Sequence, residues 1–200
     1  MINKSLILIL FFLTFGAYGQ IQRNQINDQM IKKRIQLHID KLRKTQSPDG
    51  SWNFSRRYKT GATALNVLAL ATAGIKDNDP MMKKALAFLT NNFPTLADTT
   101  YSVGLYACAF EAVDGDKYQK QIKMASDWLL ARQAKNGTWN YQGTGPGDNS
   151  ITQFGLLALK AAEDAGIKIP KKAYEKANKF FINSQRNDGG WGYTSRSSST

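Results

Sequence analysis

One nine-residue pattern recurs three times in this chain of 200 residues. Its consensus is Gln-x-x-[Asp/Asn]-Gly-x-Trp-x-[Phe/Tyr], and the copies begin at Gln46, Gln133 and Gln185. Five of the nine positions keep their residue type in all three copies, which chance explains poorly. An internal repeat restricts the fold to a row of similar supersecondary units, because one such unit cannot bury its apolar face alone.

The glutamines are 87 and 52 residues apart, and the longer interval conceals a degenerate copy. Segments 84–89 and 176–181 share the form Lys-Ala-x-x-Phe-[Leu/Phe], and 125–129 matches both from the alanine onward. In this alignment Phe93 replaces the glutamine, and the glycine-tryptophan turn is lost. The resulting units of 47, 40 and 52 residues have the period of one helical hairpin per repeat.

The conserved types in the pattern are explained by a turn between two helices. Asp-Gly or Asn-Gly ends a helix, because glycine adopts positive φ cheaply and the Asp or Asn side chain bonds the nearby backbone. The glutamine amide can bond free helix-end groups, and the tryptophan can pack beneath a neighbouring hairpin. We interpret these residues as joining the repeats, with ligand binding as the alternative. They are Gln46, Gly50, Trp52, Gln133, Gly137, Trp139, Gln185, Gly189 and Trp191.

Two kinds of helix are predicted between the turns. Segments 62–73, 101–112 and 151–165 are rich in alanine and leucine with little charge, which is typical of buried inner helices. The more charged segments are predicted as outer helices with one buried stripe. In the first of them the stripe would be Met30, Ile31, Ile35, Leu37, Ile39 and Leu42.

Glycine and proline mark where these helices end and begin. Gly74 and Gly166 should end two inner helices, and Pro80 and Pro170 should open the following outer ones. Each repeat then consists of an outer helix plus turn, followed by an inner helix. The outer helix and turn are expected at roughly 24–61, 80–100, 118–148 and 171–200, with the last repeat cut short.

The first residues predict export. Lys4 precedes an apolar run at 6–13 that leads to Ala17-Tyr18-Gly19, the layout of a signal peptide. A membrane span needs roughly 20 apolar residues, so an uncleaved anchor is the weaker alternative. We predict a signal peptide at 1–19, a single repeat domain at 20–200, and a periplasmic or extracellular location.

Net charge and cysteine content limit which partners and which covalent links the chain can be expected to form. The net charge is +12, but the lysines are spread along the predicted outer helices, where solvated faces explain most of them. Segment 56–59, Arg-Arg-Tyr-Lys, is the densest candidate for a polyanion, and no specific nucleic-acid site is predicted. Cys108 is the single cysteine, so an internal disulfide is impossible, and we expect it to be buried.

The repeat resembles a known family. Lys176-Ala177, Phe180-Phe181, Gln185 and Gly189-Gly190-Trp191 resemble the repeat motif of squalene and other triterpene cyclases, which share the α/α-toroid fold with protein prenyltransferases. Segment 147–154 resembles a stretch in exported bacterial proteins of that superfamily. The resemblance implies an all-α fold, an α/α-toroid-type array of helical hairpins. A closed toroid implies about five to seven hairpins, and only three and the start of a fourth are found, so an incomplete toroid and a fragment of a longer protein are expected.

The catalytic residues of the family do not carry over. No Asp-x-Asp-Asp cluster is present, and the nearest segment, 77–80, is better explained as a turn. Protein prenyltransferases bind zinc through Asp, Cys and His, and Cys108 and His38 are the single Cys and His of this chain. The Cys-Gly-Glu-Gln stretch that forms a thioester in complement-like toroids is missing, because Ala109 follows Cys108. We therefore predict no catalytic residues, no metal and no cofactor.

The leading hypothesis is a non-catalytic exported module that binds a ligand or partner where the inner helices begin. Its partner would be a saccharide, an anionic glycan, a lipid or another protein. The alternative is part of a terpene-cyclase-like or polysaccharide-acting enzyme with Asp98 or Asp148 as its acid, and helix capping is the simplest role for both residues. The candidate binding residues are Tyr58, Asp98, Tyr101, Asp148, Asn149 and Gln153.

Overall fold

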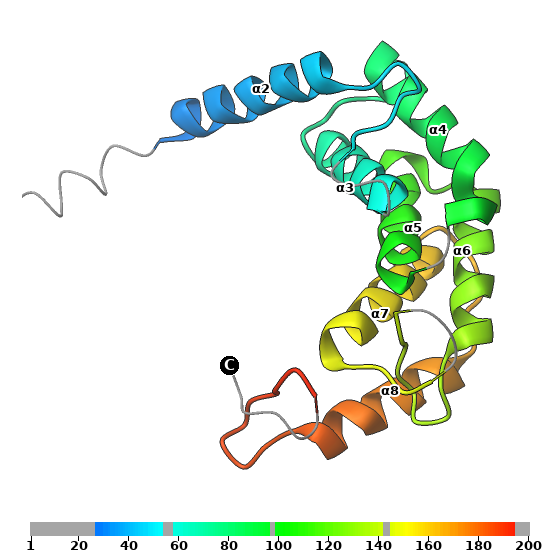
Figure 1. Cartoon of the computed structure of the whole chain (residues 1–200). Helices are drawn as coiled ribbons and strands as arrows, with labels where there is room; N and C mark the ends of the chain where they lie inside the picture. The colour runs from blue at the N-terminus through cyan, green and yellow to red at the C-terminus, as the bar shows by residue number, and fades with distance from the viewer. Residues whose placement is uncertain (1–26, 54–57, 97–98, 142–144, 195–200) are drawn as a thin grey trace, which may run out of the picture. The chain divides into compact units, whose positions relative to one another are not determined.

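The computed structural model describes residues 27–53, 58–96, 99–141 and 145–194, so the predicted signal peptide lies outside the described residues. The described residues form seven helices, which confirms the predicted all-α fold (Figure 1). None of these helices is both long and apolar enough to cross a membrane. The helices are α2 (Asp28–Thr45), α3 (Lys59–Thr72), α4 (Pro80–Leu96), α5 (Thr100–Asp114), α6 (Gln119–Arg132), α7 (Asn149–Asp164) and α8 (Lys171–Ser184).

The chain divides into two compact units, residues 1–44 and 45–200. In the first, Asn27 caps α2 by accepting the Met30 amide at 3.0 Å. The buried stripe predicted for α2 is wrong in its first turns, because Met30, Ile31, Ile35 and Leu37 are 44–55% exposed. The reason is that α2 has no second described helix in its own unit against which these side chains could pack.

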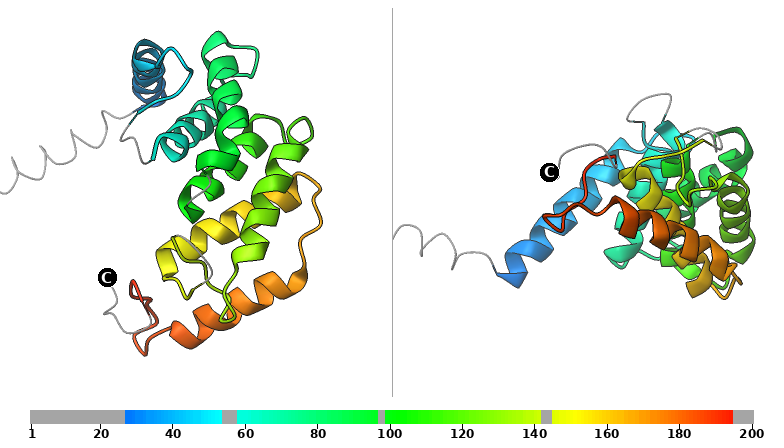
Figure 2. Two further views of the ribbon diagram at one scale, coloured as in Figure 1. Left: turned by 45° about the vertical axis from the view of Figure 1, so that its right-hand side comes forward. Right: turned by 90° about the horizontal axis from the view of Figure 1, so that it is seen from below.

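The second unit has two layers of helices (Figures 1 and 2). The inner layer is α3, α5 and α7, with α5 packed between the other two. The outer helices pack against this layer: α4 against α3, α6 against both α5 and α7, and α8 against α7. The inner helices approach closely at glycine, since a Cβ on Gly104 would lie 2.8 Å from the Phe154 carbonyl oxygen. Larger residues there would force the inner helices apart.

The core lies between the layers and includes Met82, Leu89, Tyr106, Phe110, Leu129 and Trp139. Phe93, which replaces glutamine in the degenerate copy, is buried, and its ring centroid lies 4.7 Å from that of Tyr106. This repeat thus places an aromatic side chain in the core where the other copies have a polar amide. Burial raises the pKa of the Tyr106 hydroxyl.

The inner helices end as the glycines predict. Gly74 and Gly166 have φ values of 88° and 77°, in the left-handed region that favours glycine. The amide after each glycine bonds back into the last turn, Ile75 to the Leu70 carbonyl at 3.0 Å and Ile167 to that of Ala162 at 2.9 Å. This closure directs the chain into the next outer helix.

Candidate functional site

The glutamine of each turn is a donor between backbone segments. Its Nε2 reaches the carbonyl of the turn glycine in all three copies, at 2.9, 3.1 and 2.8 Å. In the first two copies Nε2 also donates to the first turn of the next outer helix, from Gln46 to Met81 at 2.9 Å and from Gln133 to Ala173 at 2.8 Å. The amide therefore ties two consecutive hairpins together.

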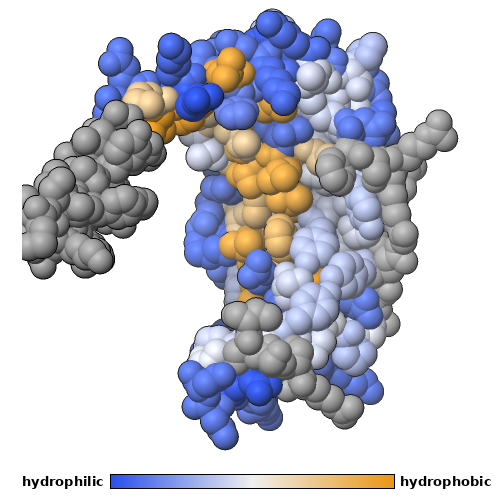
Figure 3. Space-filling view, turned by 60° about the vertical axis from the view of Figure 1, so that its left-hand side comes forward, coloured by the Kyte–Doolittle hydropathy of each residue, from blue (hydrophilic) through white to orange (hydrophobic). Residues whose placement is uncertain are grey.

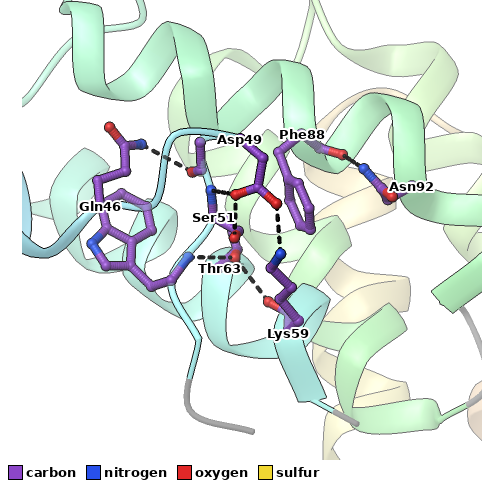
Figure 4. Close-up of polar contacts among 9 residues, drawn as sticks. Gln46, Asp49, Ser51, Lys59, Thr63, Phe88 and Asn92 are labelled. Carbon is purple, nitrogen blue, oxygen red and sulfur yellow. Dashed lines mark hydrogen bonds and ion pairs between the residues drawn. The ribbon is translucent and has the colours of Figure 1, made fainter. Parts of the chain in front are cut away.

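The acidic or amide residue of each turn bonds the backbone that follows it. Figure 4 shows these contacts for Asp49 in the first turn. Asp49 accepts hydrogen bonds from the Ser51 amide at 3.1 Å and its hydroxyl at 2.6 Å, and Asn136 binds Thr138 in the same way. Lys59 also donates to Asp49 at 2.5 Å. These donors, Lys59 first, lower the pKa of Asp49 to about 2. These hydrogen bonds stabilise the conformation of the turn.

The tryptophans of the second and third turns bond to the outer helix before them, and Trp139 also bonds to the inner helix after it. The indole Nε1 of Trp139 donates to the Leu129 carbonyl of α6 at 2.8 Å, and that of Trp191 to the Phe181 carbonyl of α8 at 2.8 Å. On the other side, the Trp139 amide bonds the Thr152 hydroxyl of α7 at 3.3 Å. The Trp139 ring is fully buried against Gly155, where a Cβ would approach it to 2.7 Å. This geometry leaves the Trp139 ring no room for a ligand.

Side chains cap two of the inner helices, α5 and α7. Thr99 accepts the Ser102 amide at 3.2 Å, and Asp148 accepts the Ile151 amide at 2.9 Å. Only 6% of Asp148 is exposed. The simplest predicted role of Asp148, helix capping, is what its geometry supports, whereas Asp98 lies outside the described residues.

A groove of about 750 Å³ lies on the inner face, between the starts of α3 and α5. Figure 3 shows apolar side chains gathered on the exposed face of the inner helices. No residue lining the groove is charged, and Asn66 provides its one side-chain amide. The lining residues are Tyr58, Gly61, Ala62, Leu65, Asn66, Thr99, Tyr101, Ser102, Leu105 and Tyr141.

Two of the groove's tyrosines have hydroxyls that are already engaged. The Tyr101 hydroxyl lies 2.5 Å from the Ser150 hydroxyl, and that of Tyr141 hydrogen bonds to the Tyr193 hydroxyl. The Tyr101 and Tyr141 rings meet edge to face with centroids 5.5 Å apart. Burial raises the pKa of Tyr101, and the hydrogen bond with Tyr193 followed by burial raises that of Tyr141. These residues therefore offer ring surface and little proton chemistry.

A second groove of about 680 Å³ lies between the start of α7 and the third turn. It contains Asn149 and Gln153, together with Trp191 and Tyr193. The side-chain Nδ2 of Asn149 donates to the Gly192 carbonyl at 2.6 Å, while the side-chain Oδ1 is buried without a hydrogen-bond partner. The predicted binding residues are thus divided between two places: Tyr58 and Tyr101 lie in the first groove, and Asn149 and Gln153 in the second.

Sequence reasoning missed Leu65, Leu105 and Tyr141 as groove residues. Leu65 and Leu105 belong to helices predicted as buried, and nothing local indicates that one face of α3 or α5 stays open. Tyr141 is the last position of the second repeat copy. It reaches the groove between α3 and α5 only through packing across more than 30 residues of chain.

A reactive thiol and a metal site have little support in the structure. Cys108 is half-buried, and burial, followed by the nearby Glu111, raises its thiol pKa to about 11, so little thiolate exists at neutral pH. No group of three His, Cys, Asp or Glu residues that could hold a metal is found in the part of the chain that the structure describes.

Comparison with known protein families and with curated proteins finds no match to this chain. Fold and site alone therefore define its class, an all-α protein built from helical hairpins with an apolar groove on the inner helices.

Proposed function

We propose that the protein is an exported, non-catalytic hairpin-repeat module of the prenyltransferase and squalene-cyclase type, which binds a predominantly apolar ligand in the groove between α3 and α5. The observation that carries the proposal is the lining: Ala62, Leu65 and Leu105 with three tyrosines in about 750 Å³, within the range of small-molecule sites. An apolar ligand there would gain from every contact and lose few hydrogen bonds to water.

The polarity of the groove favours a lipid over a saccharide or an anionic glycan. A sugar carries a hydroxyl on most carbons and needs many hydrogen-bond partners, or its binding costs the lost hydration. The Thr99 and Ser102 hydroxyls are 2.9 Å apart and bond each other, and the Tyr101 and Tyr141 hydroxyls are paired outside the lining. Asn66 is then suited to receive the single polar end of an otherwise apolar molecule.

The non-catalytic part of the proposal is supported by the position of Asp148. The enzyme hypothesis needs an acid at the inner-helix starts, and Asp148 is nearly inaccessible while it accepts the Ile151 amide. A carboxylate in that position stabilises its helix start and is poorly placed to donate a proton to a substrate.

Binding of farnesol, dodecanol and cellohexaose by the purified protein tests the proposal, with titration calorimetry as the measurement. Leu65 and Leu157 are both 52% exposed on inner helices, but only Leu65 lines the groove, so they form a matched pair. We expect the two apolar alcohols to bind and cellohexaose not to bind. Leu65→Glu should weaken alcohol binding at least about tenfold, as loss of about 1.4 kcal/mol of apolar contact predicts.

Leu157→Glu should leave alcohol binding within about twofold of the unchanged protein. Equal losses in the two variants would contradict the assignment of the groove. Binding of cellohexaose in preference to the alcohols would contradict the choice of an apolar ligand.

A further inference from the structure

A third groove, of about 510 Å³, lies in the outer layer between α4 and the residues that lead into α6. The α4 helix contributes residues from Lys83 to Asn91 at helical spacing, the connection between α3 and α4 contributes Asp77, and the approach to α6 contributes Lys117 and Tyr118. The volume is within the range of small-molecule sites. This groove shares no lining residue with the one between α3 and α5, so the two are separate.

Two lysines and one carboxylate line this groove. Lys117 forms an ion pair with Asp77, and its ammonium lies 5.3 Å from the centroid of the Tyr118 ring. The hydrogen bond from Lys117 is the largest of the interactions that lower the pKa of Asp77, and the charge of Lys83 acts in the same direction. The Lys83 ammonium forms no ion pair or hydrogen bond with another residue that the structure describes. One cation of the groove is therefore available to an anionic ligand.

The uncharged polar side chains of the groove have no protein partner either. Asn78, Thr90 and Asn91 make no side-chain hydrogen bond within the described part of the chain, in contrast to the paired hydroxyls of the groove between α3 and α5. Two amides and a hydroxyl both donate and accept hydrogen bonds. They can replace the water lost by a ligand with several hydroxyls, which the first groove cannot do.

Apolar and aromatic surface completes the lining. Leu86 is 5% exposed and lies beside the more exposed Ala87. The Tyr118 ring packs against Phe110 with centroids 5.0 Å apart, so its position is fixed before any ligand arrives. A preorganised ring lowers the entropic cost of binding. A saccharide ring presents C–H bonds on its faces and hydroxyls at its edge, and therefore matches a surface that is apolar in part and polar in part.

We propose that the groove between α4 and α6 binds a saccharide that carries one carboxylate, with the carboxylate at Lys83 and the sugar ring against Tyr118. Asn78, Thr90 and Asn91 bind its hydroxyls. A single negative charge matches the one ammonium that has no carboxylate partner. A neutral sugar leaves this ammonium unpaired, and a phosphate dianion meets repulsion from the carboxylate already present in the groove.

Binding of glucuronate, glucose and inorganic phosphate by the purified protein tests this assignment. The measurement is an NMR titration at neutral pH, followed at the side-chain amide resonances of Asn78 and Asn91. Glucuronate differs from glucose only in a carboxylate that replaces a hydroxymethyl group, so the comparison isolates the charge. We expect saturable shifts with glucuronate and at least about tenfold weaker binding of glucose and of phosphate. Equal binding of glucose, or tighter binding of phosphate, would overturn the proposal.

Lys83→Gln and Lys84→Gln form a matched pair of variants. Both remove one positive charge from neighbouring exposed positions of α4, but only Lys83 lines the groove. Lys83→Gln should weaken glucuronate binding at least about fivefold, and Lys84→Gln should leave it within about twofold. Ala87→Phe, which fills the groove from an exposed position, should block binding without a change of charge. Equal losses in the two lysine variants, or full binding by Ala87→Phe, would place the ligand elsewhere and refute the proposal.

Discussion

At the scale of single residues, glycine has two separable roles in the repeat turns. Gly137 and Gly189 have φ values of 90° and 83°, so a side chain at either position is strained. Only Gly137 also touches a neighbouring helix backbone. The same residue type at the same repeat position therefore carries a different energetic cost of substitution.

Gly137→Ala is expected to lower the free energy of unfolding by at least about 1 kcal/mol more than Gly189→Ala. Both variants pay roughly 1–2 kcal/mol for the left-handed backbone, and Gly137→Ala adds the cost of displacing α8. Urea unfolding followed by circular dichroism measures the difference. Equal losses would mean that the contact between the turn and α8 contributes nothing measurable.

The acid stability of the first turn follows from Asp49. Lys59 and Ser51 hydrogen bond its carboxylate and hold its folded-state pKa at about 2, below the 3.8 of the free side chain. A depressed pKa stabilises the fold above the unfolded value, and that stability is lost as the pH falls from about 4 toward 2. Since the Asp49 side chain is 47% exposed, the effect is reduced by solvent.

Melting temperatures measured from pH 6 to pH 2 test this role. Asp49→Asn should be less stable than the unchanged protein at pH 6 and should lose less stability below pH 4. Lys59→Met, which removes the strongest donor, should shift the profile in the same direction. If both variants lose as much thermal stability below pH 4 as the unchanged protein, carboxylates other than Asp49 cause the acid sensitivity.

At the scale of the helices, capping determines where the inner layer begins. Thr99 and Asp148 both have extended backbone and accept the amide three residues later. The amide of the next residue then bonds the last tyrosine of the following turn, Thr100 to the Tyr141 carbonyl and Asn149 to that of Tyr193. The starts of α5 and α7 are therefore each shared between their own cap and the next repeat turn.

Asp148→Ala should cost about 1–2 kcal/mol of stability, whereas Asp148→Asn should cost only a few tenths, because asparagine is an equally good N-cap. Thermal unfolding of the two variants is the measurement. A cost for Asp148→Asn as large as for Asp148→Ala would show that the negative charge matters beyond the cap.

At the scale of the second unit, residues 45–200, stability should be uneven. The α5 helix packs between α3 and α7 and also contacts α6, whereas α8 has only a small contact with α7 among the described helices. Native-state hydrogen exchange should therefore be slowest in α5 and faster in α8, because an element with fewer packed neighbours opens at lower free energy. Exchange from α5 at the rate seen in α8 would contradict a core centred on α5.

Prediction from the sequence succeeds where the relevant interactions are local. The helix ends at Gly74 and Gly166 and the cap at Asp148 depend on residues within one turn, so their chemistry is readable in order along the chain. The stripe of α2 shows the limit, since an apolar face is visible in the sequence but its burial requires a neighbour.

The sequence by itself determined the repeat, the two classes of helix and the residues that close each turn, because turn and helix preferences act over a few bonds. Only the tertiary structure decided which of these faces remain open. Leu65, Leu105 and Tyr141 come together from three repeats, and Trp139 and Trp191 hold the same repeat position but differ in burial. Burial is a property of contacts between distant segments, and similar local sequences can therefore differ in exposure.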